Sequence, residues 1–239
     1  MKYIQNIEDE AEAIKKPYDV LYYIKPLGSV NLITAPRYIA IDLGLPSGLK
    51  WANMNVGAEK ETDYGKYFQW GDTVGYTDAS HSTWATCPGN GGNSSNNADS
   101  LAAWDAANLQ SVTGMETSTK ILMPKVDAAT VNMGSKWRMP TIEDCTELLS
   151  NTNYEYTEIN GVKGGKFISK IDPSKYIFLP FAGLATGGPF VYQGIQGVVW
   201  SSSINSSAPA QAHSVSAAKS DYGDSVYFRR GALSVRGVC

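Results

Sequence analysis

The last forty residues restrict the fold of this chain more than any other stretch. Two apolar, strand-like segments, at 198–203 and 233–236, enclose a polar segment that has little hydrophobic periodicity. That polar segment is rich in Ala, Ser, Asn, Tyr and Arg, residues that adapt easily to a displayed surface. We therefore expect the two end segments to hold the shape and the middle to carry recognition.

Length and composition limit the classes of protein that remain. A chain of 239 residues forms one large domain or two small ones, and its 18% of charged residues with 23 glycines favours an extended, loop-rich scaffold. The net charge of −3 provides no basic field, so we expect no nucleic-acid partner. No run of about 18 apolar residues occurs, so we expect no membrane insertion.

The cysteines and the N-terminus indicate how the protein is made. Cys87, Cys145 and Cys239 are far apart and form no CxxC pattern. Three free thiols are a better expectation than a disulfide, although one bridge stays open. Residues 1–10 contain no apolar signal segment and become acidic at once, so we expect synthesis without a signal peptide.

The first 37 residues differ from the rest and are expected to form an N-terminal arm. A charged stretch at 8–16 predicts a short helix that Pro17 ends. Apolar β-formers at 20–24 and 30–33, separated by a Pro-Leu-Gly turn, predict a hairpin. The domain boundaries expected are therefore 1–37 for the arm and 38–239 for the main domain.

Three helices are expected within 38–239. Residues 100–110 and 127–131 are short candidates. The clearest is 141–149, where Thr141 is placed to cap the first turn and the acidic residues that follow favour the positive end of the helix dipole. Its apolar residues, Cys145 among them, fall on one stripe, so we expect that stripe to face the core.

An ordered series of motifs then resembles one known group of proteins. The series covers about 38–239 and is specific as a set: DLGLPSGLKWA at 42–52, NVGA at 55–58, YGKYFQWGD at 64–72, DAA at 127–129, WRMPT at 137–141, IFLPFAG at 177–183, WSSS at 200–203 and SVR at 234–236. It is similar to C-type-lectin-fold proteins of gut bacteria and phages, of the Fibrobacter succinogenes major paralogous domain type. It is also similar to the variable proteins of diversity-generating retroelements.

The resemblance implies both a fold and a role. The fold is α+β: a C-type lectin fold with a small twisted antiparallel sheet, two short helices and long loops. The role is non-catalytic recognition of a cell-surface glycan or protein, as a phage fibre or virion surface component. Purely structural decoration of a virion is the alternative. Formylglycine-generating enzymes share the fold, but they need a pair of neighbouring cysteines, which this spacing does not provide.

Enzymatic and metal chemistry find little support in the sequence. The chain has two histidines, His81 and His213, but none of the serines at 201–203 sits in a G-x-S-x-G elbow, and no phosphate-binding glycine motif occurs. Asp221 and Asp224 flank a turn-forming Tyr-Gly pair, for which a polar turn is a better interpretation than a calcium site. We expect no cofactor, no metal and no catalytic residue.

The expected ligand-binding residues all lie in the C-terminal polar segment. Tyrosine and arginine supply contact area, and amides adapt their hydrogen bonds, so these types are favoured. Because strands alternate, part of the set is expected to face inward. The residues are Asn205, Gln211, His213, Lys219, Asp221, Tyr222, Asp224, Tyr227, Arg229 and Arg230. Other virion subunits are the expected partners of residues 1–37, location on a virion or extracellular surface is expected, and homo-oligomer formation is left open.

Overall fold

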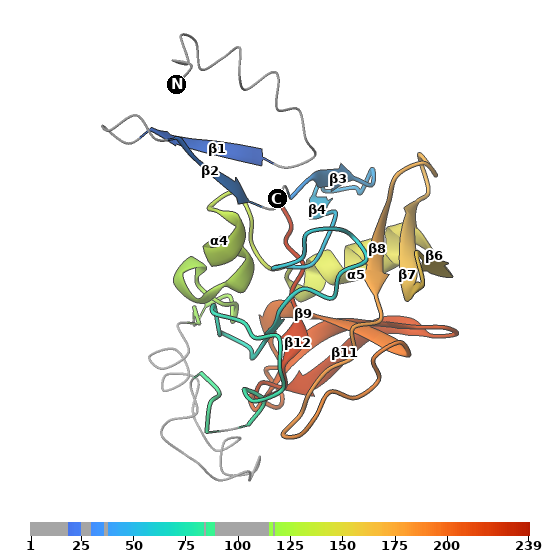
Figure 1. Cartoon of the computed structure of the whole chain (residues 1–239). Helices are drawn as coiled ribbons and strands as arrows, with labels where there is room; N and C mark the ends of the chain where they lie inside the picture. Colours follow the sequence, from blue (N-terminus) through green and yellow to red (C-terminus); the bar gives the residue numbers. More distant parts are fainter. Residues whose placement is uncertain (1–18, 25–29, 36–37, 84, 89–114, 117) are drawn as a thin grey trace. The chain divides into compact units, whose positions relative to one another are not determined.

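The computed structural model describes residues 19–24, 30–35, 38–83, 85–88, 115–116 and 118–239 (Figure 1). The chain divides into two compact units, Met1–Tyr38 and Ile39–Cys239. The expected helices at 8–16 and 100–110 lie outside the described residues. No helix in the described ranges is long and apolar enough to cross a membrane.

The first unit contains a two-stranded hairpin. Strands β1 (Asp19–Ile24) and β2 (Val30–Ala35) pair antiparallel, from Asp19 opposite Ala35 to Ile24 opposite Val30. This pairing confirms the hairpin predicted from the two β-forming runs.

The second unit is mixed α+β, mostly sheet with two short α-helices among the described residues, which confirms the predicted class. Its largest sheet has five strands in the order β11-β10-β9-β12-β5. A three-stranded sheet has the order β6-β7-β8, and β3 pairs with β4. The strands are β3 (Ala40–Asp42), β4 (Lys50–Ala52), β5 (Tyr67–Phe68), β6 (Thr152–Ile159), β7 (Val162–Ser169), β8 (Tyr176–Pro180), β9 (Gln196–Ile204), β10 (Gln211–Ala218), β11 (Tyr222–Phe228) and β12 (Leu233–Ser234).

One pairing differs from the antiparallel sheet expected. Strand β12 runs parallel to β9, with Ser234 opposite Val199, and antiparallel to β5. The chain leaves the edge strand β11, crosses through Gly231 and Ala232, and returns between β9 and β5. That crossover places the C-terminal SVR motif inside the sheet, where Ser234, Val235 and Arg236 are all buried.

The described helices form where the capping residues predict them. A short 3-10 helix, η1 (Pro124–Val126), leads into α4 (Ala128–Met133), which begins at Asp127 because its carboxylate accepts the Thr130 amide. Helix α5 (Ile142–Asn151) begins with a reciprocal capping box between Thr141 and Asp144. Both predicted helices are thereby confirmed, each within about two residues of its expected bounds.

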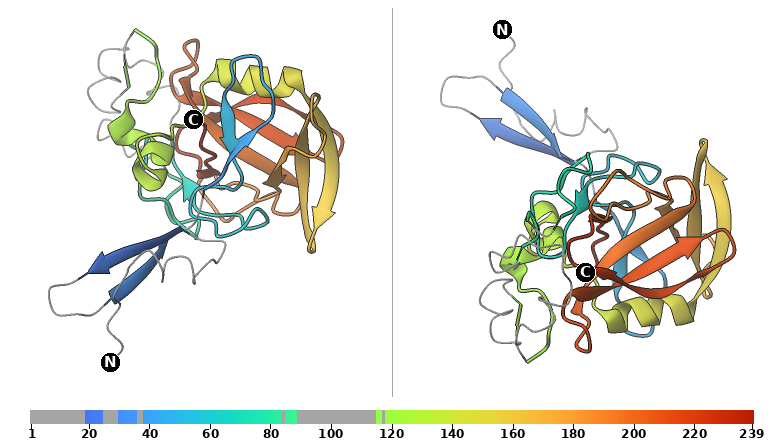
Figure 2. Two further views of the ribbon diagram at one scale, coloured as in Figure 1. Left: turned by 90° about the horizontal axis from the view of Figure 1, so that it is seen from above. Right: turned by 90° about the horizontal axis from the view of Figure 1, so that it is seen from below.

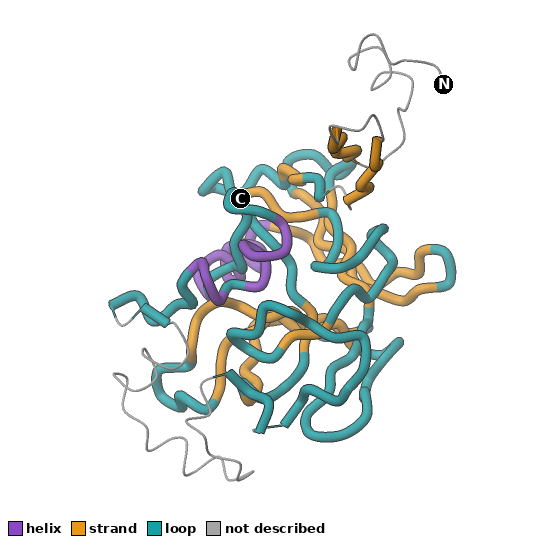
Figure 3. Tube along the Cα trace, turned by 60° about the vertical axis from the view of Figure 1, so that its left-hand side comes forward, coloured by secondary structure: helices purple, strands orange, loops and turns teal. Residues whose placement is uncertain are grey.

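Helix α5 lies along one face of the five-stranded sheet (Figure 2). Its buried residues Cys145 and Leu148 belong to the same core cluster as Val199 of β9 and Val215 and Ala217 of β10. The apolar stripe predicted for this helix therefore does face the core. Loops and turns make up much of the unit around this layer (Figure 3).

The opposite core is centred on two tryptophans that bond to each other's strands. Nε1 of Trp200 donates to the carbonyl of Phe68 at 2.8 Å, and Nε1 of Trp70 donates to the carbonyl of Ser201 at 2.9 Å. Both indoles are fully buried, so each N–H needs such a partner. The bonds join the YFQWG and WSSS segments, whose tryptophans, Trp70 and Trp200, are 130 residues apart in the sequence.

The three serines after Trp200 form an irregular part of β9. The pairing of β9 with β10 steps from Trp200 opposite Ser214 to Ile204 opposite Ala212, so β9 carries two extra residues there. The backbone groups that do not pair with β10 there form other hydrogen bonds. Ser202 N–H donates to the Pro140 carbonyl, and Leu122 N–H donates to the Ser202 carbonyl. The irregularity thus fastens the start of α5 to the central sheet.

Candidate functional site

Strands β10 and β11 form the hairpin that carries most of the expected ligand-binding residues. They pair antiparallel from Gln211 opposite Phe228 to Ala217 opposite Tyr222, and β11 is the edge strand of its sheet. Side chains alternate between the two faces of a strand. The hairpin therefore divides the expected residues between two surfaces rather than gathering them on one.

The first surface lies where β11 meets the β6-β7-β8 sheet, and we call it the edge patch: Tyr154, Tyr156, Lys219 and Tyr222. The ring of Tyr222 stacks on that of Tyr154 with centroids 4.3 Å apart, and Nζ of Lys219 lies 5.7 Å from the centroid of Tyr156. The Tyr154 hydroxyl donates to the carbonyl of Ala218. The strand-linking turn is thereby fixed, and Tyr222 keeps 41% of its surface exposed.

Two expected acidic residues border the edge patch. Asp221 and Asp224 are both exposed, and Asp224 has the same strand parity as Tyr222. A charged side chain on an edge strand opposes pairing with another strand. Asp224 can therefore protect the free edge of β11 whether or not it contacts a ligand.

The second surface lies on the opposite face of the sheet, and we call it the tyrosine face: Tyr192, Gln196, Ser225 and Tyr227. The amide Nε2 of Gln196, the first residue of β9, donates to the Tyr227 hydroxyl at 3.5 Å. Burial raises the pKa of Tyr227, hydrogen bonds with Gln196 and Ser225 oppose that change, and nearby Tyr192 adds to it. Gln196 and Ser225 thus surround the Tyr227 hydroxyl, and the N–H of Gln196 donates to the Tyr192 carbonyl at 2.9 Å, which places the Tyr192 loop next to the start of β9.

Of the expected residues, only Tyr227 belongs to this second group. Tyr192, Gln196 and Ser225 were not predicted, and two of them precede the C-terminal segment entirely. Tyr192 is 54% exposed in an uncharged, glycine-containing loop. A large aromatic between turn-forming glycines is the signal in the sequence that could have identified it.

Four further expected residues, Asn205, Gln211, His213 and Arg230, belong to neither the edge patch nor the tyrosine face. Asn205 and Gln211 bond to each other across the β9–β10 turn, Nδ2 to Oε1 at 3.3 Å. His213 is half-buried in β10 opposite Val226, and its Nδ1 has no hydrogen-bond partner among the described residues. Arg230 is half-buried, with its guanidinium 5.7 Å from the centroid of Phe228.

The prediction that Arg229 contacts a ligand does not agree with the structure. The side chain is fully buried: Nε donates to the Pro209 carbonyl at 2.8 Å and Nη1 to the Pro88 carbonyl at 3.2 Å. Burial lowers the pKa of this guanidinium, so its hydrogen bonds are needed to offset desolvation. Arg229 ties the β9–β10 turn to the 85–88 segment instead.

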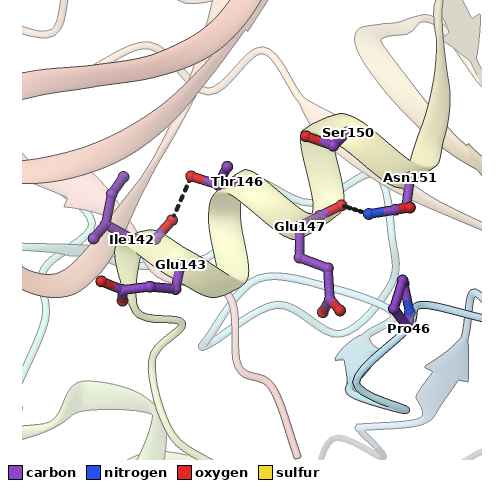
Figure 4. Close-up of a pocket in the computed structure, with 7 residues that line it drawn as sticks. All are labelled: Pro46, Ile142, Glu143, Thr146, Glu147, Ser150 and Asn151. Carbon is purple, nitrogen blue, oxygen red and sulfur yellow. Dashed lines mark hydrogen bonds between the residues drawn. The ribbon is translucent and has the colours of Figure 1, made fainter.

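A shallow groove beside α5 offers less to a ligand than either face. It measures about 430 Å³ and is lined by Pro46, Ile142, Glu143, Thr146, Glu147, Ser150 and Asn151 (Figure 4). One of its two carboxylates, Glu147, already accepts bonds from the amide and hydroxyl of Ser47 at 2.8 and 2.6 Å. The Thr146 hydroxyl and Asn151 amide bond to carbonyls of the helix itself.

One Asp-Ser-His group has triad residue types without triad connectivity. The Ser80 hydroxyl lies 2.8 Å from Nδ1 of His81 and also bonds to Asp78, so the serine stands between the other two. In a catalytic triad the histidine lies between serine and acid. His81 also stacks on Tyr76 at 3.6 Å, which fixes its ring in this turn.

The described part of the chain offers few side chains for metal ligation or for cysteine chemistry. No group of three or more His, Cys, Asp or Glu side chains there could hold a metal ion. The three cysteines are free, with Cys87 and Cys145 buried and Cys239 exposed. Burial raises the pKa of Cys87 to about 12 and also raises that of Cys145, which keeps both as thiols.

Comparisons of the chain with protein-family models, with curated proteins and with solved structures found no match.

Proposed function

We propose that this protein is a non-catalytic recognition protein with a C-type lectin fold. It presents the surface around β10 and β11 to a glycan or protein on a cell, as part of a phage fibre or virion surface. The motif series at 42–236 supports the fold, since its members pack together: WSSS bonds to the YFQWG segment, and SVR is buried beside it.

The observation that carries this proposal is the contrast between the two kinds of residue in the C-terminal segment. Trp200, Leu233 and Val235 are fully buried, while Tyr222, Asp224 and Val226 on the edge strand β11 of the same sheet are exposed. A rigid sheet that holds exposed tyrosines with few rotatable bonds gives contact area at low entropic cost. A buried framework with exposed side chains on its edge strand is what a displayed binding surface requires.

Cell binding tests the proposal directly. Fluorescently labelled protein would be added to a panel of gut bacteria, with Tyr222→Ala and Tyr227→Ala compared with the unaltered chain. We expect binding to at least one strain, and at least one of the two variants to weaken it about tenfold, the loss of a central aromatic contact. Equal binding by all three proteins, or none by the unaltered chain, would contradict the proposal.

The N-terminal arm has a proposed role of its own. Residues 1–38 cluster as a separate unit that contains the β1–β2 hairpin, and a two-stranded hairpin alone is marginally stable in water. We propose that the arm binds other virion subunits, whose surfaces would cover and stabilise the hairpin. Solution mass of the protein with and without residues 1–37 tests this: an assembly that persists after truncation would contradict it, as would a monomer in both cases.

A further inference from the structure

The loop between β8 and β9 presents an apolar surface at its tip. Val191, Tyr192 and Ile195 expose 40%, 54% and 62% of their surfaces within five residues. Tyr192 also has φ of +61°, a left-handed conformation that costs a bulky residue about 1 kcal/mol or more. The conformation has a cost and the exposed ring gains little burial from it, which points to a use for the ring.

This loop is held in one conformation by its own hydrogen bonds. Leu184 and Val191 exchange two backbone bonds, and Gly194 N–H donates to the Phe181 carbonyl at 2.7 Å. The tip closes so tightly on Gly183 that a Cβ there would lie 2.2 Å from the Val191 carbonyl oxygen. The amide of Gln193 donates to the Tyr67 hydroxyl at 3.1 Å, which ties the tip to the core. Tyr192 is therefore presented rigidly.

The chain around this loop is uncharged over an unusual length. No Asp, Glu, Lys or Arg occurs from 176 to 218, which is 43 residues (218 − 175) in a chain with 18% charged residues. That stretch includes β8, the loop, β9 and β10. Arg230 is a cation that approaches this loop at Gly187, where an added Cβ would lie 2.7 Å from its Nη1, and its guanidinium lies 5.7 Å from the centroid of Phe228.

The chemistry left on the tyrosine face is aromatic, amide and hydroxyl. Aromatic rings bind apolar faces, such as the C–H face of a pyranose, and amide and hydroxyl groups can exchange hydrogen bonds with its hydroxyls. An anionic ligand would meet no cation among these four side chains, and a cationic one would meet no carboxylate. The surface is therefore matched to an uncharged, hydroxyl-rich ligand.

We propose that Tyr192, Gln196, Ser225 and Tyr227 form a subsite for an uncharged sugar residue of a surface glycan, with Tyr192 as the stacking platform. This inference rests on the recognition function above and names the ligand class for it. Tyr192 lies on the β8–β9 loop, so the subsite extends beyond the β10–β11 hairpin.

An oligosaccharide array tests the subsite. It would carry uncharged probes (malto-, manno-, cello- and galacto-oligosaccharides) and acidic ones (sialylated and sulfated oligosaccharides). We expect binding to at least one uncharged probe, about tenfold weaker for Tyr192→Ala and nearly unchanged for Tyr192→Phe, which keeps the ring. Gln196→Glu places a negative charge on the face without changing its size, and we expect weaker binding there too.

Ile171→Ala is the matched control, because it removes an apolar side chain that is 77% exposed in the β7–β8 turn, outside both the edge patch and the tyrosine face. We expect it to leave binding to the sugar probes within about twofold, far less than the tenfold loss of a stacking contact. Binding to no uncharged probe, preference for acidic probes, or an unchanged affinity in Tyr192→Ala would each overturn the subsite. Cell binding that depends on Tyr222 or Tyr227 but not on Tyr192 would overturn the subsite alone and leave the recognition function standing.

Discussion

Nε of Arg236 donates a 2.9 Å hydrogen bond to Oδ1 of Asn55, 181 residues away in sequence. Nη1 and Nη2 of the same guanidinium donate to the carbonyls of Ala52 and Phe178 at 2.9 and 2.8 Å. The side chain is buried, and burial lowers its pKa to about 9. A single residue of the SVR motif thus joins β4, the 55–58 loop and β8.

Arg236→Met should therefore destabilise the protein strongly. It leaves three buried acceptors unsatisfied, and we expect a loss of about 3 kcal/mol or more in the free energy of unfolding. Arg138→Met is the matched control, since Arg138 is 43% exposed beside Asp144 and should lose about 1 kcal/mol or less. Urea denaturation of both variants provides the measurement. Equal losses in the free energy of unfolding would show that the buried hydrogen bonds of Arg236 do not stabilise the fold more than an exposed arginine does.

Thiol reactivity should separate the three cysteines. Because Cys87 and Cys145 are buried with raised pKa values, we expect one thiol, that of Cys239, to react with Ellman's reagent in the folded protein. All three should react in denaturant. Cys239→Ser should abolish the reaction of the folded protein, and a second fast-reacting thiol would contradict the burial of the other two.

Stability should decline above pH 10. Burial raises the pKa of Tyr67 and of Tyr154 to about 12, so between pH 10 and 12 the folded state holds protons that the unfolded state has lost. Their contribution is complete below pH 10 and is lost as the pH rises through 12. Denaturation at pH 9 and 11.5 should show a smaller decline in Tyr67→Phe, although that variant loses the hydroxyl bond to Ala182. If Tyr67→Phe lost as much stability between pH 9 and 11.5 as the unaltered protein, the raised pKa of Tyr67 would not explain the decline.

The sequence predicts local elements better than it predicts the composition of surfaces. Helix α5 follows from Thr141 and the residues next to it, since a capping box and an apolar stripe are local signals. The tyrosine face has no such signal: Gln196 of β9 reaches the Tyr227 hydroxyl of β11 only because both strands flank β10 in the folded sheet. The burial of Arg229 has no local signal either, because its partners Pro209 and Pro88 become neighbours only in the folded chain.

The Tyr192 loop provides a test of how it is built. Gly183→Ala adds a Cβ 2.2 Å from the Val191 carbonyl oxygen at φ of +68°, so we expect a loss of about 1–3 kcal/mol in the free energy of unfolding. Gly188→Ala is the control in the same loop, since a Cβ there meets no atom within 4 Å. Thermal denaturation should place Gly188→Ala near the unaltered protein, and similar losses in both variants would contradict the close packing at Gly183.

Tyr192 itself allows binding to be separated from stability. Tyr192→Gly and Tyr192→Ala both remove the ring, which is 54% exposed and contributes little burial, so both should lose sugar binding equally. Only glycine relieves the left-handed backbone at φ of +61°, so we expect Tyr192→Gly to be more stable than Tyr192→Ala by about 1 kcal/mol. Denaturation curves and the sugar array applied to the same two proteins measure both effects. If the two variants differed in binding as they differ in stability, loop conformation rather than the ring would account for recognition.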